Sequence, residues 1–113
     1  MTAFTERLFS YGTLQFDSVQ LANFGRLLDG RSDTMPGWRT ELIEITDPDV
    51  LKASGERFHP VVSPGESDDE VVGKVFEITA EELAAADRYE VSDYKRIEVT
   101  LKSGTAAWVY VRA

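Results

Sequence analysis

Apolar and polar side chains alternate most regularly near the end of the chain. From residue 97 to residue 102 (IEVTLK) the alternation has a period of two, which predicts a half-buried β-strand. Ser103-Gly104 separates this segment from a second apolar segment, residues 106–111 (AAWVYV). A two-residue connection containing glycine favours a hairpin between the two segments.

The same pattern gives an expected register for the hairpin. A closing pair at positions 102 and 105 would place Val99 opposite Trp108 and Ile97 opposite Tyr110. Side chains opposite each other lie on one face of a sheet, so both strands would contribute to one apolar face.

Other segments predict strands by their apolar residues and turn-forming boundaries: residues 7–11, 38–45 and 71–78. Gly12 ends the first of these strands, and Asp47-Pro48-Asp49 ends the second. Residues 17–28 space their apolar side chains as a helix or helical turn does, with an interruption at Gly25. Residues 29–37 (DGRSDTMPG) are rich in turn-forming residues and predict a turn region.

One helix has a clear start signal. Thr79 is followed three residues later by Glu82, the capping-box spacing in which each side chain bonds a free backbone amide of the other residue. The predicted helix continues to Glu90, before residues 91–93 (VSD) break the pattern.

Strands at both ends, with one clear helix between them and no repeat or linker, predict an α+β fold with a mainly antiparallel or barrel-like sheet. At 113 residues the chain is long enough for one hydrophobic core and too short for two. We therefore expect residues 1–113 to form a single domain.

The charge is acidic overall and uneven along the chain. Twenty acidic and twelve basic residues give a net charge of -8, which repels nucleic acid and anionic lipid, so we expect neither as a partner. Residues 41–93 hold 15 acids and 4 bases, which favours a solvated acidic face. Within this region residues 59–70 predict an extended segment followed by an exposed loop, with Asp68-Asp69-Glu70 as a solvated tip and not a metal site.

The composition excludes several kinds of site and location. The chain contains no cysteine, which excludes disulfides, a thiolate nucleophile and cysteine-ligated metals. It has no apolar run long enough to span a membrane and no signal-peptide pattern, so we expect a cytoplasmic protein. The single histidine, His59, has no triad spacing, and the glycines match no nucleotide-binding motif. We expect no metal and no cofactor.

Glu90 is the candidate general base. It lies seven residues after Leu83 and four after Ala86, on one apolar stripe of the predicted helix. Burial there would raise the pKa of its carboxyl group toward neutrality, as proton transfer requires. Alternatively, Glu90 frays from the helix end and pairs with Lys95, Arg96 or Arg88.

Tyr11-Gly12-Thr13-Leu14 is the candidate binding turn. It follows a predicted strand, so its backbone amides could converge on a carboxylate or carbonyl oxygen without a basic side chain. The alternative is a plain turn at the end of a strand.

In combination these motifs resemble a known family. Leu8 to Leu14 is similar to the opening signature of the γ-glutamylcyclotransferase-like family. The family's later blocks follow in order: residues 59–62 (HPVV), 72–78 (VGKVFEI), 86–90 (ADRYE), 94–96 (YKR) and 108–111 (WVYV).

The resemblance implies a small mixed β-barrel with short flanking helices. It also implies that Glu90 is the catalytic acid/base, that Tyr11, Gly12, Thr13 and Leu14 form a turn that gives backbone amides to the substrate, and that Tyr94 lines the pocket. Members usually have Leu before the aspartate and Gly after the glutamate, where this chain has Ala86 and Val91, a difference that bears on which substrate fits.

The family reaction is the cyclisation of a γ-glutamyl amine or peptide to 5-oxoproline with release of the amine. The resemblance thus implies a small-molecule substrate and an enzyme without a cofactor. Two alternatives remain open: a non-catalytic small-molecule-binding domain on the same fold, or an enzyme acting on a different acyl amide.

Overall fold

The computed structural model describes residues 4–44, 48, 58–90 and 94–113, which form an α+β fold. Its elements follow the chain in this order: β1 (Glu6–Ser10), the 3-10 turn η1 (Thr13–Gln15), α1 (Asp17–Phe24), β2 (Asp29–Pro36), β3 (Trp38–Glu44), β4 (Phe58–Pro64), β5 (Glu70–Ile78), α3 (Ala80–Tyr89), β6 (Tyr94–Thr100) and β7 (Ala106–Arg112).

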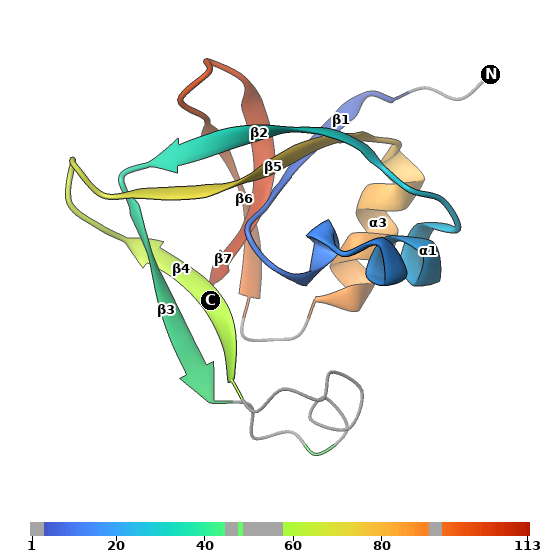
Figure 1. Cartoon of the computed structure of the whole chain (residues 1–113), viewed down its shortest axis with the longest axis horizontal. Coiled ribbons are helices and arrows are strands. Elements are labelled where there is room, and N and C mark those ends of the chain that lie inside the picture. The colour runs from blue at the N-terminus through green and yellow to red at the C-terminus, as the bar shows by residue number, and fades with distance from the viewer. Residues whose placement is uncertain (1–3, 45–47, 49–57, 91–93) are drawn as a thin grey trace.

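A mixed five-stranded sheet with the order β2-β5-β1-β7-β6 forms the centre of the fold (Figure 1). The short strand β1 lies in the middle, antiparallel to β5 and parallel to β7. β3 and β4 pair with each other in a separate two-stranded sheet. The predicted binding turn therefore begins at the end of the central strand of the large sheet.

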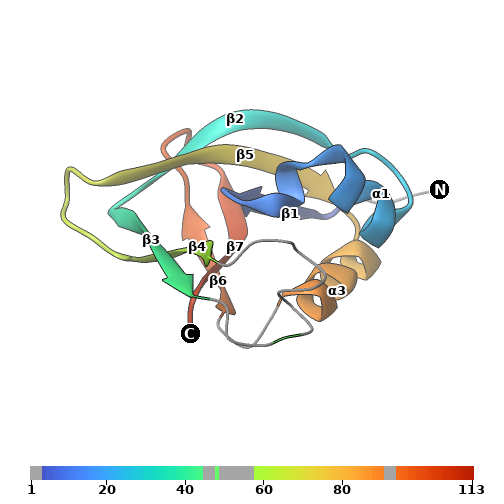
Figure 2. The same ribbon diagram turned by 60° about the horizontal axis from the view of Figure 1, so that its bottom comes forward.

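The two faces of the large sheet carry different cores, because successive side chains of a strand point to opposite faces. Leu8 and Tyr110 face α1 and α3, together with Leu83 and Ala86 of α3. Phe9 lies on the opposite face, which packs against Val62 of β4. Figures 1 and 2 show α1 and α3 side by side at one end of the molecule, away from β3 and β4.

The sheet is not closed into a barrel, so that part of the predicted fold is wrong. β2 and β6 are its edges, and no ladder joins them in the described part of the chain. The sheet does curl, since the loop after β6 reaches β2: the amide of Lys102 donates to the carbonyl of Thr34 at 2.8 Å. Contact through a hairpin tip brings two edge strands together without pairing them. An alternating apolar pattern predicts strands but not whether the edge strands pair, so it cannot distinguish a curled sheet from a barrel.

The turn region predicted for residues 29–37 is also wrong, since most of it forms β2. This strand pairs with β5 along its whole length, from Asp29 opposite Glu77 to Pro36 opposite Glu70. β2 is an edge strand with mostly exposed residues, so it forms through backbone pairing without the apolar alternation that marks a half-buried strand.

The C-terminal hairpin forms, but its predicted register is off by one residue. Val99 lies opposite Ala107 and Ile97 opposite Val109. The connection is three residues long, closed by hydrogen bonds from the Leu101 amide to the Thr105 carbonyl and from the Gly104 amide to the Leu101 carbonyl, both 2.8 Å. Gly104 has a φ of 90°, which lets the chain add this third residue.

The helix predictions are confirmed. Thr79 and Glu82 form the predicted capping box, and α3 ends at Tyr89 with Glu90 as its C-cap. α1 ends at Phe24, immediately before Gly25. The predictions for residues 47, 49 and 91–93 lie outside the described residues.

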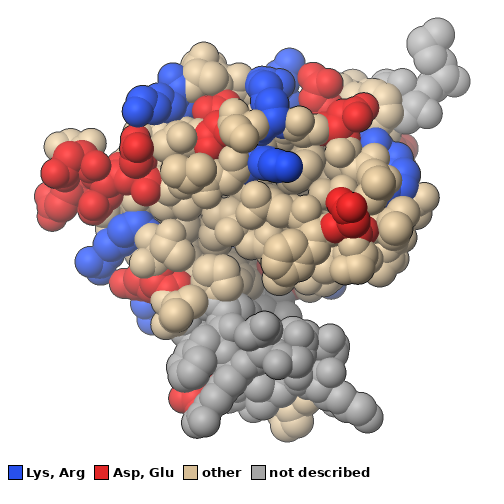
Figure 3. Space-filling view, viewed as in Figure 1, with Lys and Arg blue, Asp and Glu red and all other residues tan. Residues whose placement is uncertain are grey.

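The loop between β4 and β5 is an exposed acidic tip, as predicted. Glu66 and Asp68 are exposed, and Asp69 is half-buried because its carboxylate accepts a hydrogen bond from the Glu66 amide at 2.8 Å. Figure 3 shows acidic side chains gathered at this edge of the molecule. Across the described residues, no helix has the length and apolar character needed to cross a membrane.

Candidate functional site

The Tyr11–Leu14 turn begins where β1 ends. Its backbone is closed by hydrogen bonds from the Gln15 amide to the Gly12 carbonyl at 3.1 Å and from the Phe16 amide to the Thr13 carbonyl at 2.9 Å. The amides that begin a helical turn have no partner within it, and those of Thr13 and Leu14 have none elsewhere among the described residues, so both can act as donors. The Gly12 amide differs, because it donates to Ser10 Oγ at 3.3 Å.

Glu90 lies directly after α3, and its backbone is fixed by a hydrogen bond from its amide to the Ala86 carbonyl at 3.0 Å. Its side chain is half-buried, and no described residue forms a hydrogen bond or ion pair with its carboxylate. Burial raises the pKa of the Glu90 carboxyl group to about 7. Near neutral pH this group is therefore present in both its acid and base forms.

The basic residues that could have paired with Glu90 do not do so in the described part of the chain. Arg96 instead bonds Asp87, with 2.9 Å between Nε and Oδ1. Arg88 and Lys95 are exposed. A carboxylate without a nearby cation keeps its raised pKa and is free to meet a cationic group of a ligand.

Tyr11 of the predicted site lies close enough to both Glu90 and Tyr94 for their charges to affect it. The pKa of the Tyr11 hydroxyl is raised, mainly by burial and further by the charges of Tyr94 and Glu90. Its hydroxyl donates to the Tyr110 carbonyl at 2.6 Å, and that of Tyr94 donates to the Pro60 carbonyl at 2.6 Å. The structure thus brings together Tyr11 at the end of β1, Tyr94 at the start of β6 and Glu90 at the end of α3.

The turn also touches α3 directly. Thr13 Oγ1 and the Tyr89 hydroxyl share a hydrogen bond of 2.7 Å between residues 76 positions apart. Leu14 is buried in the same core as Leu83 and Ala86. Ala86, one of the two departures from the family pattern, is completely buried, and Val91 lies outside the described residues.

Tyr110 is a supporting residue that the sequence pattern did not indicate. Burial, a hydrogen bond to Asp87 Oδ1 at 2.7 Å, the Asp87 charge and the Glu90 charge together raise the pKa of its hydroxyl. Asp87 in turn holds Arg96, whose guanidinium stacks on the Trp108 ring at 4.4 Å. These residues all stand in motif blocks of the sequence, but nothing in their spacing indicates that they contact one another.

Gln20, which the sequence analysis also missed, supports the turn from α1. Its Nε2 donates to the Leu14 carbonyl at 2.9 Å, and its Oε1 accepts from the Leu28 amide at 2.9 Å. The side chain is 3% exposed, so these bonds satisfy a buried amide. The sequence did contain a signal for this role, because Gln20 is a polar residue four positions before Phe24, on the inner face of the predicted helix.

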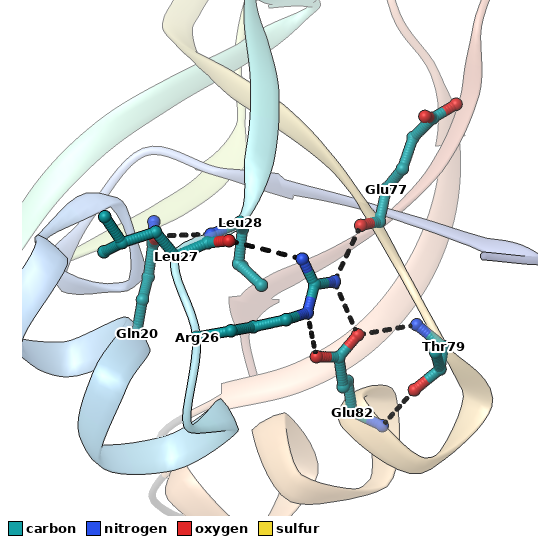
Figure 4. Close-up of polar contacts among 7 residues, drawn as sticks. All are labelled: Gln20, Arg26, Leu27, Leu28, Glu77, Thr79 and Glu82. Atoms are coloured by element: carbon teal, nitrogen blue, oxygen red, sulfur yellow. Dashed lines mark hydrogen bonds and ion pairs between the residues drawn. The ribbon is translucent and has the colours of Figure 1, made fainter. Parts of the chain in front are cut away.

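Arg26 fastens the end of α1 to the start of α3 (Figure 4). Its Nε and one Nη bond the two carboxylate oxygens of Glu82 at 2.7 and 2.8 Å, and a further bond reaches the Glu77 carbonyl. Glu82 is the capping-box residue of α3, so one side chain joins both helices. Bidentate pairs of this kind fix geometry as well as charge.

The described residues contain no group of three or more His, Asp or Glu side chains that could hold a metal ion. His59 lies on β4, but its side chain is not among the described parts. Among the described residues the site thus consists of one carboxylate with a raised pKa, several tyrosines and two turn amides, a set suited to proton transfer and to binding an oxygen atom.

A family model described as gamma-glutamyl cyclotransferase, AIG2-like, matches residues 8–113. The match covers the turn, both core faces and the Glu90 region, so the chain belongs to this family. A comparison with curated proteins gave no match.

Solved structures of other proteins share this fold. Two Arabidopsis thaliana proteins are 25% and 21% identical, with TM-scores of 0.71 and 0.73; each match covers 95% of this chain and 68% and 61% of theirs. A gamma-glutamyl cyclotransferase is 14% identical with a TM-score of 0.71, over 96% of this chain and 66% of that one. The chain thus spans 61–68% of the length of these three neighbours.

Proposed function

We propose that this protein is a γ-glutamylcyclotransferase-type enzyme, which cyclises a γ-glutamyl amine or peptide to 5-oxoproline and releases the amine. The observation that supports this most is Glu90, a half-buried carboxylate that has no partner among the described residues and a pKa raised to about 7. A general base with a pKa near the working pH combines a large ionised fraction with an adequate affinity for the proton.

The reaction is an intramolecular aminolysis and needs no nucleophile from the protein. The substrate's α-amino nitrogen attacks its own γ-carbonyl carbon, a bond forms between them, and the bond from that carbon to the leaving nitrogen breaks. The α-ammonium group loses two protons and the leaving amine gains two, so the step balances without water, metal or cofactor.

Glu90 would transfer protons between the two nitrogen atoms. Its carboxylate attracts the substrate's ammonium group, accepts a proton from it and, as the carboxylic acid, donates a proton to the leaving nitrogen. The raised pKa helps the first of these steps, because a fully exposed glutamate would be too weak a base to accept the proton. With a pKa of about 7 the carboxylic acid can still donate the proton in the second step.

The turn would hold an oxygen atom of the substrate. The amides of Thr13 and Leu14 begin η1, whereas the Gly12 amide already donates to Ser10. Two such donors can bind the substrate's carboxylate or stabilise the oxygen on which charge develops. Because both reacting groups belong to one molecule, holding it in a ring-like pose supplies much of the rate enhancement.

Tyr94 would line the pocket beside Glu90. Its hydroxyl is directed to the Pro60 carbonyl, and its charge state influences Tyr11. Because its hydroxyl is held in this way, the Tyr94 ring would present a fixed aromatic surface to a ligand instead of a mobile polar group.

The proposal can be tested with a panel of γ-glutamyl amines and dipeptides, with 5-oxoproline as the measured product. Glu90→Gln is compared with Glu81→Gln, a matched change at an exposed glutamate of the same helix. We expect wild type and Glu81→Gln to turn over the same substrate, and Glu90→Gln to be slower by about 10²–10⁴-fold.

Each other outcome points to a specific rival. Saturable binding of a panel member without turnover would favour a binding domain on this fold. Cleavage of other acyl amides without 5-oxoproline would favour a different substrate class. Equal rates for wild type and Glu90→Gln would exclude Glu90 as the base.

A further inference from the structure

The two halves of the proposed site come from elements that are distant in sequence. The turn follows β1 and Glu90 follows α3, so the distance between the amide donors and the base depends on how these elements are joined. The hydrogen bond of 2.7 Å between Thr13 Oγ1 and the Tyr89 hydroxyl joins them at the nearest positions, within the turn and one residue before Glu90.

We propose that Tyr89 is a positioning residue, whose hydroxyl fixes the turn relative to Glu90 through Thr13. This inference rests on the proposed function. Tyr89 does not need to touch the substrate for this role, because it is bonded to Thr13 of the turn and precedes Glu90 directly in the chain.

The hydrogen bonds that hold the Glu90 backbone and close the turn lie within each half. The Glu90 backbone is held within its own helix by the Ala86 carbonyl, and the turn is closed by its own Gln15 and Phe16 amides. Gln20 holds the carbonyl side of Leu14 from α1, and not from α3. The bond between Thr13 and Tyr89 therefore adds what these contacts lack, a directional link between the donors and the base.

The hydrogen bond between Thr13 and Tyr89 is partly shielded from water. Both residues are half-buried, and Tyr89 packs against the core that contains Leu14 and Leu83. A hydrogen bond screened in this way from water holds its geometry better than an exposed one. Reactions of preoriented groups are sensitive to small displacements, so loosening the turn should slow the chemical step.

Amide hydrogen exchange tests the link without depending on activity. Tyr89→Phe keeps the ring in the core and removes the hydroxyl, and Thr13→Val removes the other partner. We expect each variant to speed exchange of the Gln15 and Phe16 amides by about three- to tenfold, since one hydrogen bond is lost. The amides of Leu101 and Gly104, in the distant hairpin, serve as the internal control and should not change.

Kinetics then test the consequence for the reaction. We expect kcat of Tyr89→Phe and of Thr13→Val to fall by a similar factor of about three to ten, with the double variant no slower than either. Thr13→Ser, which keeps the hydroxyl, should lose less kcat than Thr13→Val. The pH at which the rate is half-maximal should stay the same in all of them, because Glu90, the proposed base, is unchanged.

The possible failures are distinguishable. Unchanged exchange in Tyr89→Phe would overturn the positioning role, even if the wild type is an active cyclotransferase. A loss of kcat in Tyr89→Phe that is equally large in the Thr13→Val background would also overturn it, because the hydroxyl would then act on the substrate directly. If the wild type forms no 5-oxoproline, the proposed function fails, and exchange alone decides whether Tyr89 holds the turn.

Discussion

At the scale of single residues, Glu90 illustrates a conflict between stability and function. Burial that raises the pKa of its carboxyl group also makes the ionised form unfavourable in the folded protein. The described residues provide no ion pair to offset this. We therefore expect the protein to be less stable in the state in which it is active.

The first prediction is that Glu90→Gln stabilises the fold at alkaline pH. The folded pKa of about 7 lies above the ordinary value of 4.5, so the folded state binds more protons between these values and stability falls as pH rises through them. Above pH 8 the variant should be more stable than wild type by up to about 3 kcal/mol, and below pH 4 this pH-dependent advantage should disappear.

Denaturant unfolding from pH 4 to pH 9 measures this difference. Glu81→Gln is the matched control, since this exposed glutamate lies on the same helix. A Glu90→Gln advantage that does not vary with pH would contradict the raised pKa.

The candidate site could be predicted at single positions but not as a set of contacts. Glu90 was a candidate because an acidic residue interrupts an apolar stripe, and the turn because a glycine follows a strand. Tyr110 and Gln20 were missed, because their importance depends on partners 23 and 6 residues away that the sequence does not pair with them. Spacing reveals which residues share a face, whereas hydrogen-bond partners require the fold.

At the scale of elements, β5 fits against β1 because of Gly73. A side-chain carbon at this position would collide with the Ser10 carbonyl oxygen and come within 2.8 Å of the Phe9 ring. The obstructing backbone belongs to the central strand, which is paired on both sides and cannot move easily. A close approach of two backbones is a specific use of glycine in a strand.

The second prediction is that Gly73→Ala destabilises the protein by about 1–3 kcal/mol, the usual cost of overpacking. Unfolding by denaturant measures the effect. Gly12→Ala is the matched control for stability, because the new carbon would meet only a Pro60 side-chain atom at 3.8 Å. Equal stability of the two variants would show that β1 and β5 are not packed as described.

Elements with an apolar pattern were predicted well, and those defined by backbone pairing were not. The capping box of α3 and the apolar run of β5 both lie where the pattern put them. β2 was missed because its mostly polar edge position leaves no alternation, and the hairpin register was missed because Gly104 allows one more loop residue. Backbone hydrogen bonds do not depend on side-chain polarity, so such features are hidden from a pattern of side chains.

At the scale of the whole molecule, the curled sheet is held by its hairpin tip. Asp33 of β2 accepts hydrogen bonds from the Thr34 amide at 2.8 Å and from the Ser103 hydroxyl in the tip. Burial opposes ionisation of Asp33, but the hydrogen bonds from Ser103 and Thr34 outweigh it and lower the pKa of the carboxyl group. One carboxylate thus connects the two edges that a barrel would have joined by a ladder.

The third prediction is that Asp33→Asn destabilises the protein by about 1–2 kcal/mol at neutral pH, through the loss of charge-assisted hydrogen bonds. A lowered folded pKa means that this contribution is present above the unfolded value and is lost as pH falls through the folded value. Unfolding at pH 7 and at pH 2.5 measures whether the effect shrinks in acid, with Asp68→Asn in the exposed loop as control. An effect that is as large at pH 2.5 as at pH 7 would contradict the role of the charged form.

The central claim is that an ionised Glu90 removes a proton from a bound γ-glutamyl substrate. The most direct test is the rate of 5-oxoproline formation, as kcat/KM, between pH 5 and pH 9. We predict that kcat/KM rises about tenfold per pH unit on the acidic side and levels off near pH 7, where Glu90 becomes ionised, and that Glu90→Gln lacks this limb. A profile that is flat across pH 7, or an unchanged limb in Glu90→Gln, would contradict the claim.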